Sequence, residues 1–307
     1  MRILFSLFNI LFINCLFAQI NLPTWKESLL DSNGTNGLIN LYSSSSDLEF
    51  LDGTTDRFKG YYATYDIKNK NSKIKINYTE LPENHVKKFM DDQKTILLVN
   101  GGFFGKNGSL SLVINRNKLL SKNPSVLTRN GKKRCLSRPA FYISKKNEPK
   151  ISWVYTLGEK SFSLTKPISS KSCLDLENFV HNEENERISP LCAIGGGPML
   201  IVNGKIISNY EKELFMDDVV NSKAPRTAIG ITNDKKIIIL LVEGRVAQSK
   251  GVSLQTLSKI LKGIGCENAM NLDGGGSSFM YAYNEKINKF STSKIRKIAS
   301  SIAISIN

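Results

Sequence analysis

One loop near the C-terminal end constrains the fold of this chain most. An apolar segment, Ala269–Leu272, is followed by a carboxylate, three glycines and two hydroxyls in the sequence Asp273–Ser278. Glycines let the backbone adopt positive φ and approach a ligand closely. Successive exposed N–H groups can form a concave anion-binding site. The loop therefore predicts either a tight turn between two strands or a cradle for an acidic substrate beside a carboxylate.

Three other segments place glycine or a charged residue where an apolar run ends: Asn100–Phe104, Gly195–Pro198 and Glu243–Arg245. A fourth, Ala224–Thr227, places an arginine just before a predicted strand. Because each places a polar group at a strand terminus, we expect these loops to surround one shared pocket.

Strand signals outnumber helix signals along the chain. Apolar and alternating runs predict strands over 61–67, 73–78, 95–99, 110–114, 118–120, 139–144, 151–155, 192–194, 199–202, 227–232, 236–242, 269–272, 279–283 and 299–306. Helices are predicted over 81–90 and 253–263, the second with Ser253 as its cap. The predicted class is α+β, a strand-rich mixed sheet domain with few helices and an active site built from glycine-rich loops at strand ends.

The first residues predict export. Arg2 precedes an apolar run, Ile3–Phe17, that is too short to span a bilayer and ends at the small Ala18. We predict a signal peptide over 1–18, a lead-in with peripheral strands over 19–90 and the main domain over 91–307. The protein would be secreted, periplasmic or at the cell surface, with no integral membrane span after cleavage. A lipoprotein anchored at Cys15 and an uncleaved anchor are alternatives.

The formal charge of +15, or +14 once Arg2 is removed, favours an acidic partner. A phosphorylated glycan or an envelope polysaccharide would suit it. The basic clusters, such as Lys132–Arg134 and Lys145–Lys146, have few aromatic residues near them. We therefore interpret the charge mainly as composition and expect no nucleic-acid partner.

The cysteines indicate disulfide chemistry more than metal binding. Exported chains permit disulfides, and no C-x-x-C pair marks a zinc site. We predict a Cys173–Cys192 bridge, with Cys266 as a buried free thiol at the end of a helix.

The two histidines, His85 and His181, lie far from the glycine-rich segments in sequence. A Ser-His-Asp triad that uses Ser277 is therefore not predicted. No cofactor is required, and no metal ligand is assigned. A hard cation such as Ca²⁺ or Mg²⁺ could still be held by Asp273, Asn100 or a bound phosphate.

Two carboxylates and two arginines are the best candidates for chemistry. Asp273 and Glu243 could activate water or attack a sugar. Arg226 and Arg245 could clamp a phosphate. A loop cap, an ion pair or a plain surface position is the alternative for each. Further candidates for substrate or phosphate binding are Asn100, Gly101, Gly196, Gly197, Gly275, Gly276, Ser277 and Ser278.

These segments together resemble the phosphodiester glycosidase family. The matching words are NGGFF at 100–104, AIGGGPMLIVNG at 193–204, APRTAIGIT at 224–232, VEGR at 242–245 and GVSLQTLSKILKGIGCENAMNLDGGGSSFM at 251–280. They occur in the family's order and cover most of residues 95–305. The best-known member of the family, the uncovering enzyme, removes N-acetylglucosamine from phosphodiester-masked mannose 6-phosphate.

The resemblance implies a strand-rich α/β domain that hydrolyses a sugar-1-phosphodiester. One residue departs from the family pattern, which commonly has Asp where this chain has Glu243. The extra methylene could move a catalytic oxygen by about an ångström, and such a displacement can lower a rate about 10²-fold. A non-catalytic glycan- or phosphate-binding surface protein on the same scaffold is therefore the alternative hypothesis.

Overall fold

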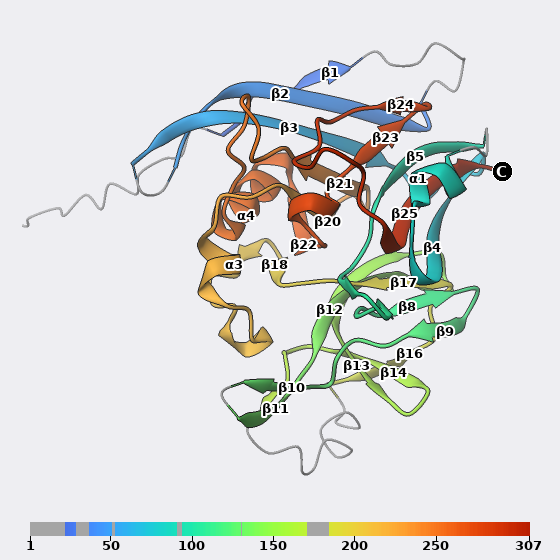
Figure 1. Cartoon of the computed structure of the whole chain (residues 1–307). Coiled ribbons are helices and arrows are strands. Elements are labelled where there is room, and N and C mark those ends of the chain that lie inside the picture. Colours follow the sequence, from blue (N-terminus) through green and yellow to red (C-terminus); the bar gives the residue numbers. More distant parts are fainter. Residues whose placement is uncertain (1–21, 29–36, 51–52, 91–93, 130, 171–183) are drawn as a thin grey trace, which may run out of the picture.

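A computed structural model describes residues 22–28, 37–50, 53–90, 94–129, 131–170 and 184–307 (Figure 1). Within these ranges the chain consists mainly of strands, arranged in several sheets that share an interior. The predicted strand-rich α+β class is confirmed. The predicted signal peptide, residues 1–18, lies outside the described residues.

The largest sheet carries the strands that end at the candidate site. Its eight described strands, in spatial order, are β1 (Lys26–Ser28), β2 (Ile39–Glu49), β3 (Thr55–Tyr65), β21 (Ile237–Val242), β20 (Arg226–Thr232), β22 (Cys266–Asn271), β18 (Met199–Val202) and β19 (Lys205–Ile206). Each neighbouring pair is antiparallel. Every residue of β21 is buried, because both faces of the sheet are covered there. This explains why the strand is a continuous apolar run without alternation.

Helix α4 (Leu254–Ile264) covers one face of this sheet and packs on β18 and β22 (Figure 1). Its apolar residues recur at helical spacing and are buried, including Leu254, Leu257 and Leu261. Ser253 caps the helix, because its Oγ accepts a hydrogen bond from the Thr256 N–H at 3.2 Å. The helix predicted over 253–263 is confirmed.

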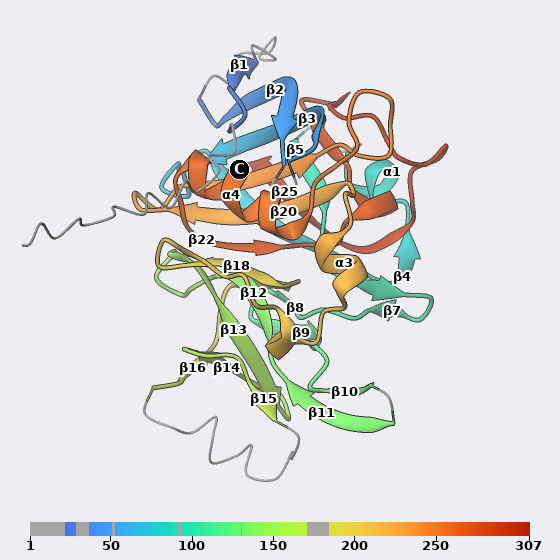
Figure 2. The same cartoon turned by 90° about the vertical axis from the view of Figure 1, so that its left-hand side faces the viewer.

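Two more sheets complete the core. The five-stranded sheet has the order β24 (Glu285–Lys286), β23 (Met280–Ala282), β5 (Thr95–Asn100), β25 (Ile298–Ile306) and β4 (Ser72–Glu83). The seven-stranded sheet, green to yellow in the lower half of Figure 2, has the order β16 (Glu186–Ile188), β14 (Lys160–Leu164), β13 (Pro149–Leu157), β12 (Arg138–Ile143), β17 (Cys192–Gly195), β8 (Val113–Asn115) and β9 (Lys118–Ser121). Leu241, Ile302 and Phe141, one from each sheet, belong to the same buried cluster.

The remaining described elements are short. They are β6 (Phe104–Gly105), β7 (Gly108–Ser109), β10 (Val126–Arg129), β11 (Lys132–Leu136), β15 (Ser169–Ser170), α1 (His85–Phe89), η1 (Glu211–Glu213), α3 (Asp217–Asn221) and η2 (Gly275–Ser277). No helix in the described ranges has the length and apolar character needed to cross a membrane.

The helix predicted over 81–90 is wrong in its first half. Leu81 and Pro82 continue strand β4, and α1 begins at His85. Asn84 caps α1, because its Oδ1 accepts a hydrogen bond from the Lys87 N–H at 3.1 Å. The pairing of β4 with β25 extends to Glu83, so the sheet takes residues that would otherwise form the first turn of the helix.

The N-terminal strands are part of the main sheets. Residues 39–49, for which the sequence predicts an irregular lead-in or a peripheral strand, form β2. Strand β3 pairs with β21 over Gly60–Tyr65, and β4 pairs with β25. The domain boundary at residue 90 stays a prediction, and hydrogen-bonded strands lie on both sides of it.

The predicted Cys173–Cys192 bridge is wrong. Cys192 is a buried free thiol in β17, and Cys173 lies outside the described residues. Cys266 is also free and buried, as predicted. Burial raises the pKa of both Cys192 and Cys266 to about 12.

Candidate active site

Strands β21 and β22 end, and the strand between them, β20, begins, at the same end of the eight-stranded sheet. Because β20 runs antiparallel to β21 and β22, its first residue lies beside the last residues of the other two strands. Arg226 pairs with Val242, and the Leu272 N–H donates to the Thr227 carbonyl at 2.8 Å. The segments that carry Glu243, Arg226 and Asp273 therefore lie together at the same end of the sheet.

Asn100 connects this end of the eight-stranded sheet to the five-stranded sheet. Its Oδ1 accepts hydrogen bonds from the Thr227 hydroxyl at 2.7 Å and from the Phe279 N–H at 3.3 Å. Its Nδ2 donates to the carbonyl oxygens of Asp273 at 2.7 Å and Gly101 at 3.4 Å. The side chain is fully buried, and its hydrogen-bonding capacity is filled by protein. The predicted substrate contact of Asn100 is therefore corrected, since its side chain positions the loop that carries Asp273.

The Asp273 carboxylate is half-buried at the start of that loop. The Gly274 N–H donates to its Oδ1 at 2.9 Å. Burial raises the pKa of Asp273 to about 6, against the opposing effects of the Ser277 hydroxyl, the Gly274 N–H and the positive charge of Arg296. Such a carboxyl group is largely ionised at neutral pH and is basic enough to accept a proton from water in a transition state.

Most N–H groups of the glycine loop are used within the protein. Gly275 donates to the Pro225 carbonyl at 2.9 Å, and Ser277 and Ser278 donate back to Gly274 and Gly275 at 3.2 Å each. These bonds wind the segment into η2. The predicted cradle of successive free N–H groups is therefore wrong for these three residues.

Two donors of the loop have no partner within the described part of the protein. Among the described residues, no main-chain acceptor is paired with the Gly276 N–H, and the buried Ser278 hydroxyl has no hydrogen-bond partner. A ligand phosphate at this loop would therefore meet one free N–H, not a ring of backbone donors.

Arg245 lies on the exposed side of the loop. Its Nη1 is 3.6 Å from the position that a Cβ on Gly275 would occupy. No carboxylate of the described residues forms an ion pair with Arg245. Its guanidinium is thus close to η2 and free to bind an anion.

Arg226, the second predicted phosphate clamp, is buried and mostly engaged by protein. Its Nε donates to the Val252 carbonyl at 3.0 Å, and its Nη2 donates to the carbonyls of Val219 and Ser222 at 2.8 Å each. Burial lowers the pKa of Arg226 to about 10, and the charge of Arg245 acts in the same direction. Through these contacts Arg226 anchors α3 and the segment before α4 at the edge of the site, and its predicted phosphate contact stays a prediction.

Glu243 is almost fully buried, with 1% of its surface exposed. Its Oε1 accepts hydrogen bonds from the Lys289 N–H at 2.6 Å and the Tyr61 hydroxyl at 3.5 Å, and its Oε2 accepts one from Gln248 Nε2 at 3.1 Å. The carboxylate therefore ties β3 and the segment after β24 to the end of β21. Both of its oxygens already accept hydrogen bonds from protein.

The predicted glycines near the site are required by packing. A Cβ on Gly101 would lie 2.5 Å from the Ser300 hydroxyl, and one on Gly196 would lie 2.5 Å from the Asn271 carbonyl oxygen. A Cβ on Gly197, which has a φ of 138°, would lie 2.9 Å from the ring of Phe215. These glycines let segments of different sheets approach each other, and the substrate contacts predicted for them stay predictions.

Two buried charged residues, Glu213 and Arg138, were not singled out by the sequence analysis. Glu213 lies next to Gly197. Glu213 Oε1 accepts hydrogen bonds from Trp153 Nε1 and the Met199 N–H, both at 2.9 Å, and its Oε2 has no partner among the described residues. Burial raises the pKa of Glu213 to about 7, although Arg138 opposes the shift. In the sequence, Glu213 belongs to the charged run Glu211–Glu213 and gives no sign of burial.

Aromatic rings cover this pair on the side of the predicted NGGFF segment. The Arg138 guanidinium lies 4.0 Å from the centre of the Phe215 ring, and the rings of Phe215 and Phe103 are 5.9 Å apart. Phe103 therefore packs against protein in this conformation.

The described histidine, His85, is part of the scaffold. Its ring nitrogens contact the hydroxyls of Thr79 at 3.0 Å and Ser301 at 2.9 Å, and burial lowers its pKa to about 4. His181 lies outside the described residues. No group of three or more His, Cys, Asp or Glu side chains that could hold a metal occurs within the described ranges.

Comparisons with known proteins agree with this architecture. A family model described as phosphodiester glycosidase matches residues 93–305. A solved structure of the zebrafish N-acetylglucosamine-1-phosphodiester alpha-N-acetylglucosaminidase catalytic domain, auto-inhibited by its pro-peptide, superposes with a TM-score of 0.63 and 19% identity. The superposition covers 92% of this chain and 89% of that chain, and at this identity it shows the shared fold.

Two curated proteins are similar over shorter segments. The chain is 36% identical over 86 residues to the SPbeta prophage-derived uncharacterized protein YomE of Bacillus subtilis, covering 28% of this chain and 13% of that protein. It is 31% identical over 94 residues to the mouse N-acetylglucosamine-1-phosphodiester alpha-N-acetylglucosaminidase, covering 28% of this chain and 18% of that protein. The matched segment thus spans less than a fifth of either relative.

Proposed function

The chain belongs to the phosphodiester glycosidase family, and from this premise we propose that it hydrolyses a sugar-1-phosphodiester bond in an extracellular or envelope glycan. The mouse relative is named for N-acetylglucosamine-1-phosphodiester, so a diester of that sugar is the first substrate to test. The anomeric C–O bond is the bond that we propose to break.

One observation carries the proposal: the partly buried Asp273 carboxylate begins the loop against which the Arg245 guanidinium, unpaired among the described residues, lies. Its pKa of about 6 suits a general base near neutral pH. Arg245 lies against the same loop, at Gly275. A carboxylate for the water and a cation for the phosphate are the two groups that this hydrolysis needs.

The proposed reaction is one displacement at the anomeric carbon. Asp273 accepts a proton from a water molecule, whose oxygen forms a bond to that carbon. The bond between the anomeric carbon and the phosphate oxygen breaks, and its electron pair leaves with the phosphate as a monoester. Because a phosphate is already a stabilised anion, the leaving group depends less on a general acid than an alcohol does.

The leaving phosphate would be held by Arg245 and the Gly276 N–H. A guanidinium can donate two parallel hydrogen bonds to a phosphate. Arg226 and Asn100 would keep the loop in place from behind. Glu243, whose oxygens accept three hydrogen bonds, would hold the neighbouring wall instead of attacking the sugar.

The test uses N-acetylglucosamine 1-(methyl phosphate) with the wild type and Asp273→Asn. We expect the variant to lower kcat/KM by roughly 10²–10⁴-fold, since it removes the base and keeps the side-chain shape. Asp234→Asn is the matched control, because Asp234 is exposed in the hairpin at the far end of β20 and β21. Wild-type turnover in the Asp273 variant would contradict the proposed mechanism.

The same measurement decides the alternative of a non-catalytic binding protein. If the wild type binds the diester but releases no sugar, the chain uses the scaffold for binding alone. We also propose that the protein is exported through a signal peptide. Its partner would be a phosphorylated glycan or an envelope polysaccharide, and it would not bind nucleic acid.

A further inference from the structure

A cavity of about 310 Å³ lies where β21 ends beside the middle of β3, next to the segment that carries Glu243. Its lining residues include Lys59, Tyr61, Glu243, Gln248, Lys286 and Lys289. We refer to it as the basic pocket. Because Lys59 and Tyr61 lie outside residues 93–305, one wall comes from a part of the chain that the family model does not cover.

The charges of the basic pocket are unbalanced. Its three lysines give +3 and Glu243 gives −1, so the lining carries a net +2. Among the described residues none of these lysines forms an ion pair. Lys59 Nζ instead lies 5.7 Å from the centre of the Tyr61 ring, and Lys286 Nζ lies 4.8 Å from that of Phe290. An anionic group in the pocket would relieve the repulsion between the ammonium groups.

The other groups in the lining, Glu243, Tyr61 and Gln248, restrict which anion fits. Glu243 would repel a bare anion that fills the pocket, whereas a hydroxyl could donate a hydrogen bond to its Oε2, which accepts one from Gln248 at 3.1 Å. The Tyr61 hydroxyl and the Gln248 amide add further hydrogen-bonding groups. A phosphate ester of a polyol or sugar combines a charge for the lysines with hydroxyls for these groups.

The wall of the pocket is continuous with the Asp273 loop. Asn288 accepts a hydrogen bond from the Met280 N–H at 2.7 Å and donates to the Ser278 carbonyl at 3.4 Å. The Ser291 hydroxyl donates to the Gly275 carbonyl at 3.4 Å. The segment 286–291 thus forms one side of the pocket and supports η2 with its other side.

We propose that the basic pocket binds a second phosphate-bearing polyol or sugar unit of a polymeric substrate whose scissile unit lies at Asp273. This inference rests on the proposed function, and it specifies the substrate as a polyanion with repeated phosphate esters. Two contacts far enough apart to hold neighbouring units raise the affinity for a polymer over that for a single diester.

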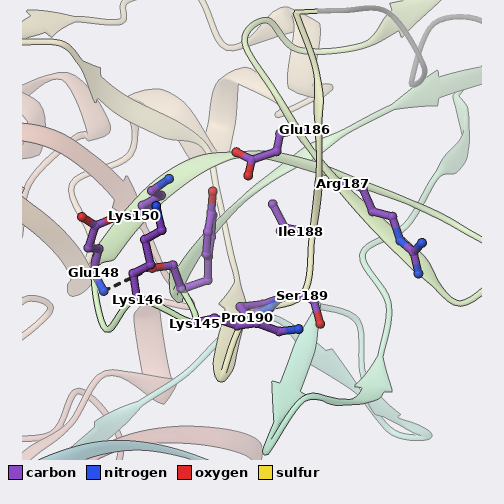
Figure 3. Close-up of a pocket in the computed structure, with 11 residues that line it drawn as sticks. Lys145, Lys146, Glu148, Lys150, Glu186, Arg187, Ile188, Ser189 and Pro190 are labelled. Carbon is purple, nitrogen blue, oxygen red and sulfur yellow. Dashed lines mark hydrogen bonds between the residues drawn. The ribbon is translucent and has the colours of Figure 1, made fainter.

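A second lysine-rich pocket serves as the control. Figure 3 shows it at the turn between β12 and β13, where Lys145 and Lys146 lie near Glu148 and Glu186. Strand β12 begins at Arg138 near the candidate site and is six residues long, so this turn is roughly 20 Å away. The two lysines are exposed and carry the same charge as the pair Lys59 and Lys289.

The experiment is calorimetric titration of a short glycerol phosphate oligomer into the full chain. We expect Lys59→Met with Lys289→Met to weaken binding about tenfold, as for the loss of two charge-assisted contacts near a surface. The control, Lys145→Met with Lys146→Met, should bind like the wild type. Methionine keeps the apolar part of each side chain, and the main-chain N–H of Lys289 that donates to Glu243 is retained.

Three outcomes would overturn the inference. They are absence of oligomer binding by the wild type, equal weakening in both double variants, and equally tight binding of inorganic polyphosphate, which has no hydroxyls. Wild-type turnover of N-acetylglucosamine 1-(methyl phosphate) separates the two proposals. Turnover without oligomer binding removes the basic pocket alone, whereas pocket-dependent binding without turnover removes the proposed function alone.

Discussion

Asn100 Nδ2 donates a 2.7 Å hydrogen bond to the carbonyl oxygen of Asp273, across 173 residues of sequence. The bond connects the end of β5 with the end of β22, two strands of different sheets. It places the proposed base where the five-stranded and eight-stranded sheets meet. The position of Asp273 therefore depends on how these sheets are joined, as well as on its own loop.

Replacing Asn100 with Ala should lower both stability and turnover. Three protein groups would lose their closest partner in a buried site, namely the Thr227 hydroxyl, the Phe279 N–H and the Asp273 carbonyl. We expect the free energy of unfolding to fall by about 2–4 kcal/mol in urea denaturation. Asn115→Ala is the control, because Asn115 donates one bond, to the Ile76 carbonyl, away from the site. Equal losses in the two variants would contradict the bracing role.

Asp273→Asn should stabilise the protein while it removes activity. The pKa of Asp273 is raised to about 6, so the folded state disfavours the ionised carboxylate above that pH. We expect a gain of about 1–2 kcal/mol at pH 8, discounted because Asp273 is only partly buried. The gain should shrink as the pH falls through 6 toward 4, where the wild-type group is protonated in the folded state as well. Denaturation curves at several pH values provide the measurement, and a variant less stable at pH 8 would contradict the assignment.

Glu213→Gln and Glu213→Ala should change stability in opposite directions at pH 8. Gln keeps an acceptor for Trp153 Nε1 and the Met199 N–H and removes a buried charge whose pKa is raised to about 7, so we expect a gain of about 1–2 kcal/mol. Ala leaves both donors without an acceptor and opens a cavity, with an expected loss of about 3–5 kcal/mol. The gain from Gln should fade as the pH drops below 7.

Glu211→Gln, in the same turn but exposed, is the control for thermal unfolding. A loss of stability in Glu213→Gln equal to that in Glu213→Ala would show that the buried charge itself is stabilising.

The free thiols give a test of the core that is independent of activity. Cys192 and Cys266 are buried, and burial raises the pKa of each to about 12. Since the thiolate is the reactive form, both should resist alkylation in the native protein and react after unfolding. Mass spectrometry of non-reduced peptides makes the measurement. A peptide that joins Cys173 to Cys192 would contradict the structure.

The sequence predicted the frame of the site because local signals mark it. Apolar runs with turn residues at their ends identified the strands of the Asn233–Asp234 hairpin and the strand before Asp273. The pairing of these strands then brings the segments of Glu243, Arg226 and Asp273 together. Periodicity and turn chemistry carry this much information in a single sequence.

The roles of individual side chains could not be predicted in this way, because distant partners decide them. From the sequence, Glu243 is predicted to be a catalytic carboxylate. In the structure, the N–H of Lys289, 46 residues later, donates a hydrogen bond to it. From the sequence, Arg226 is predicted to be a phosphate clamp. In the structure, carbonyl groups of α3 and of the segment before α4 accept its hydrogen bonds. The buried Glu213 has no local signal, since its charged neighbours in the sequence are typical of a solvated turn.

The most direct test of the central claim locates the bond that breaks. N-acetylglucosamine 1-(methyl phosphate) is incubated with the wild type in water enriched in heavy oxygen, and both products are examined by mass spectrometry. Attack at the anomeric carbon predicts the label in the released sugar and none in methyl phosphate, with Asp273→Asn forming little of either product. Label in the phosphate would instead show cleavage of the P–O bond and contradict the account.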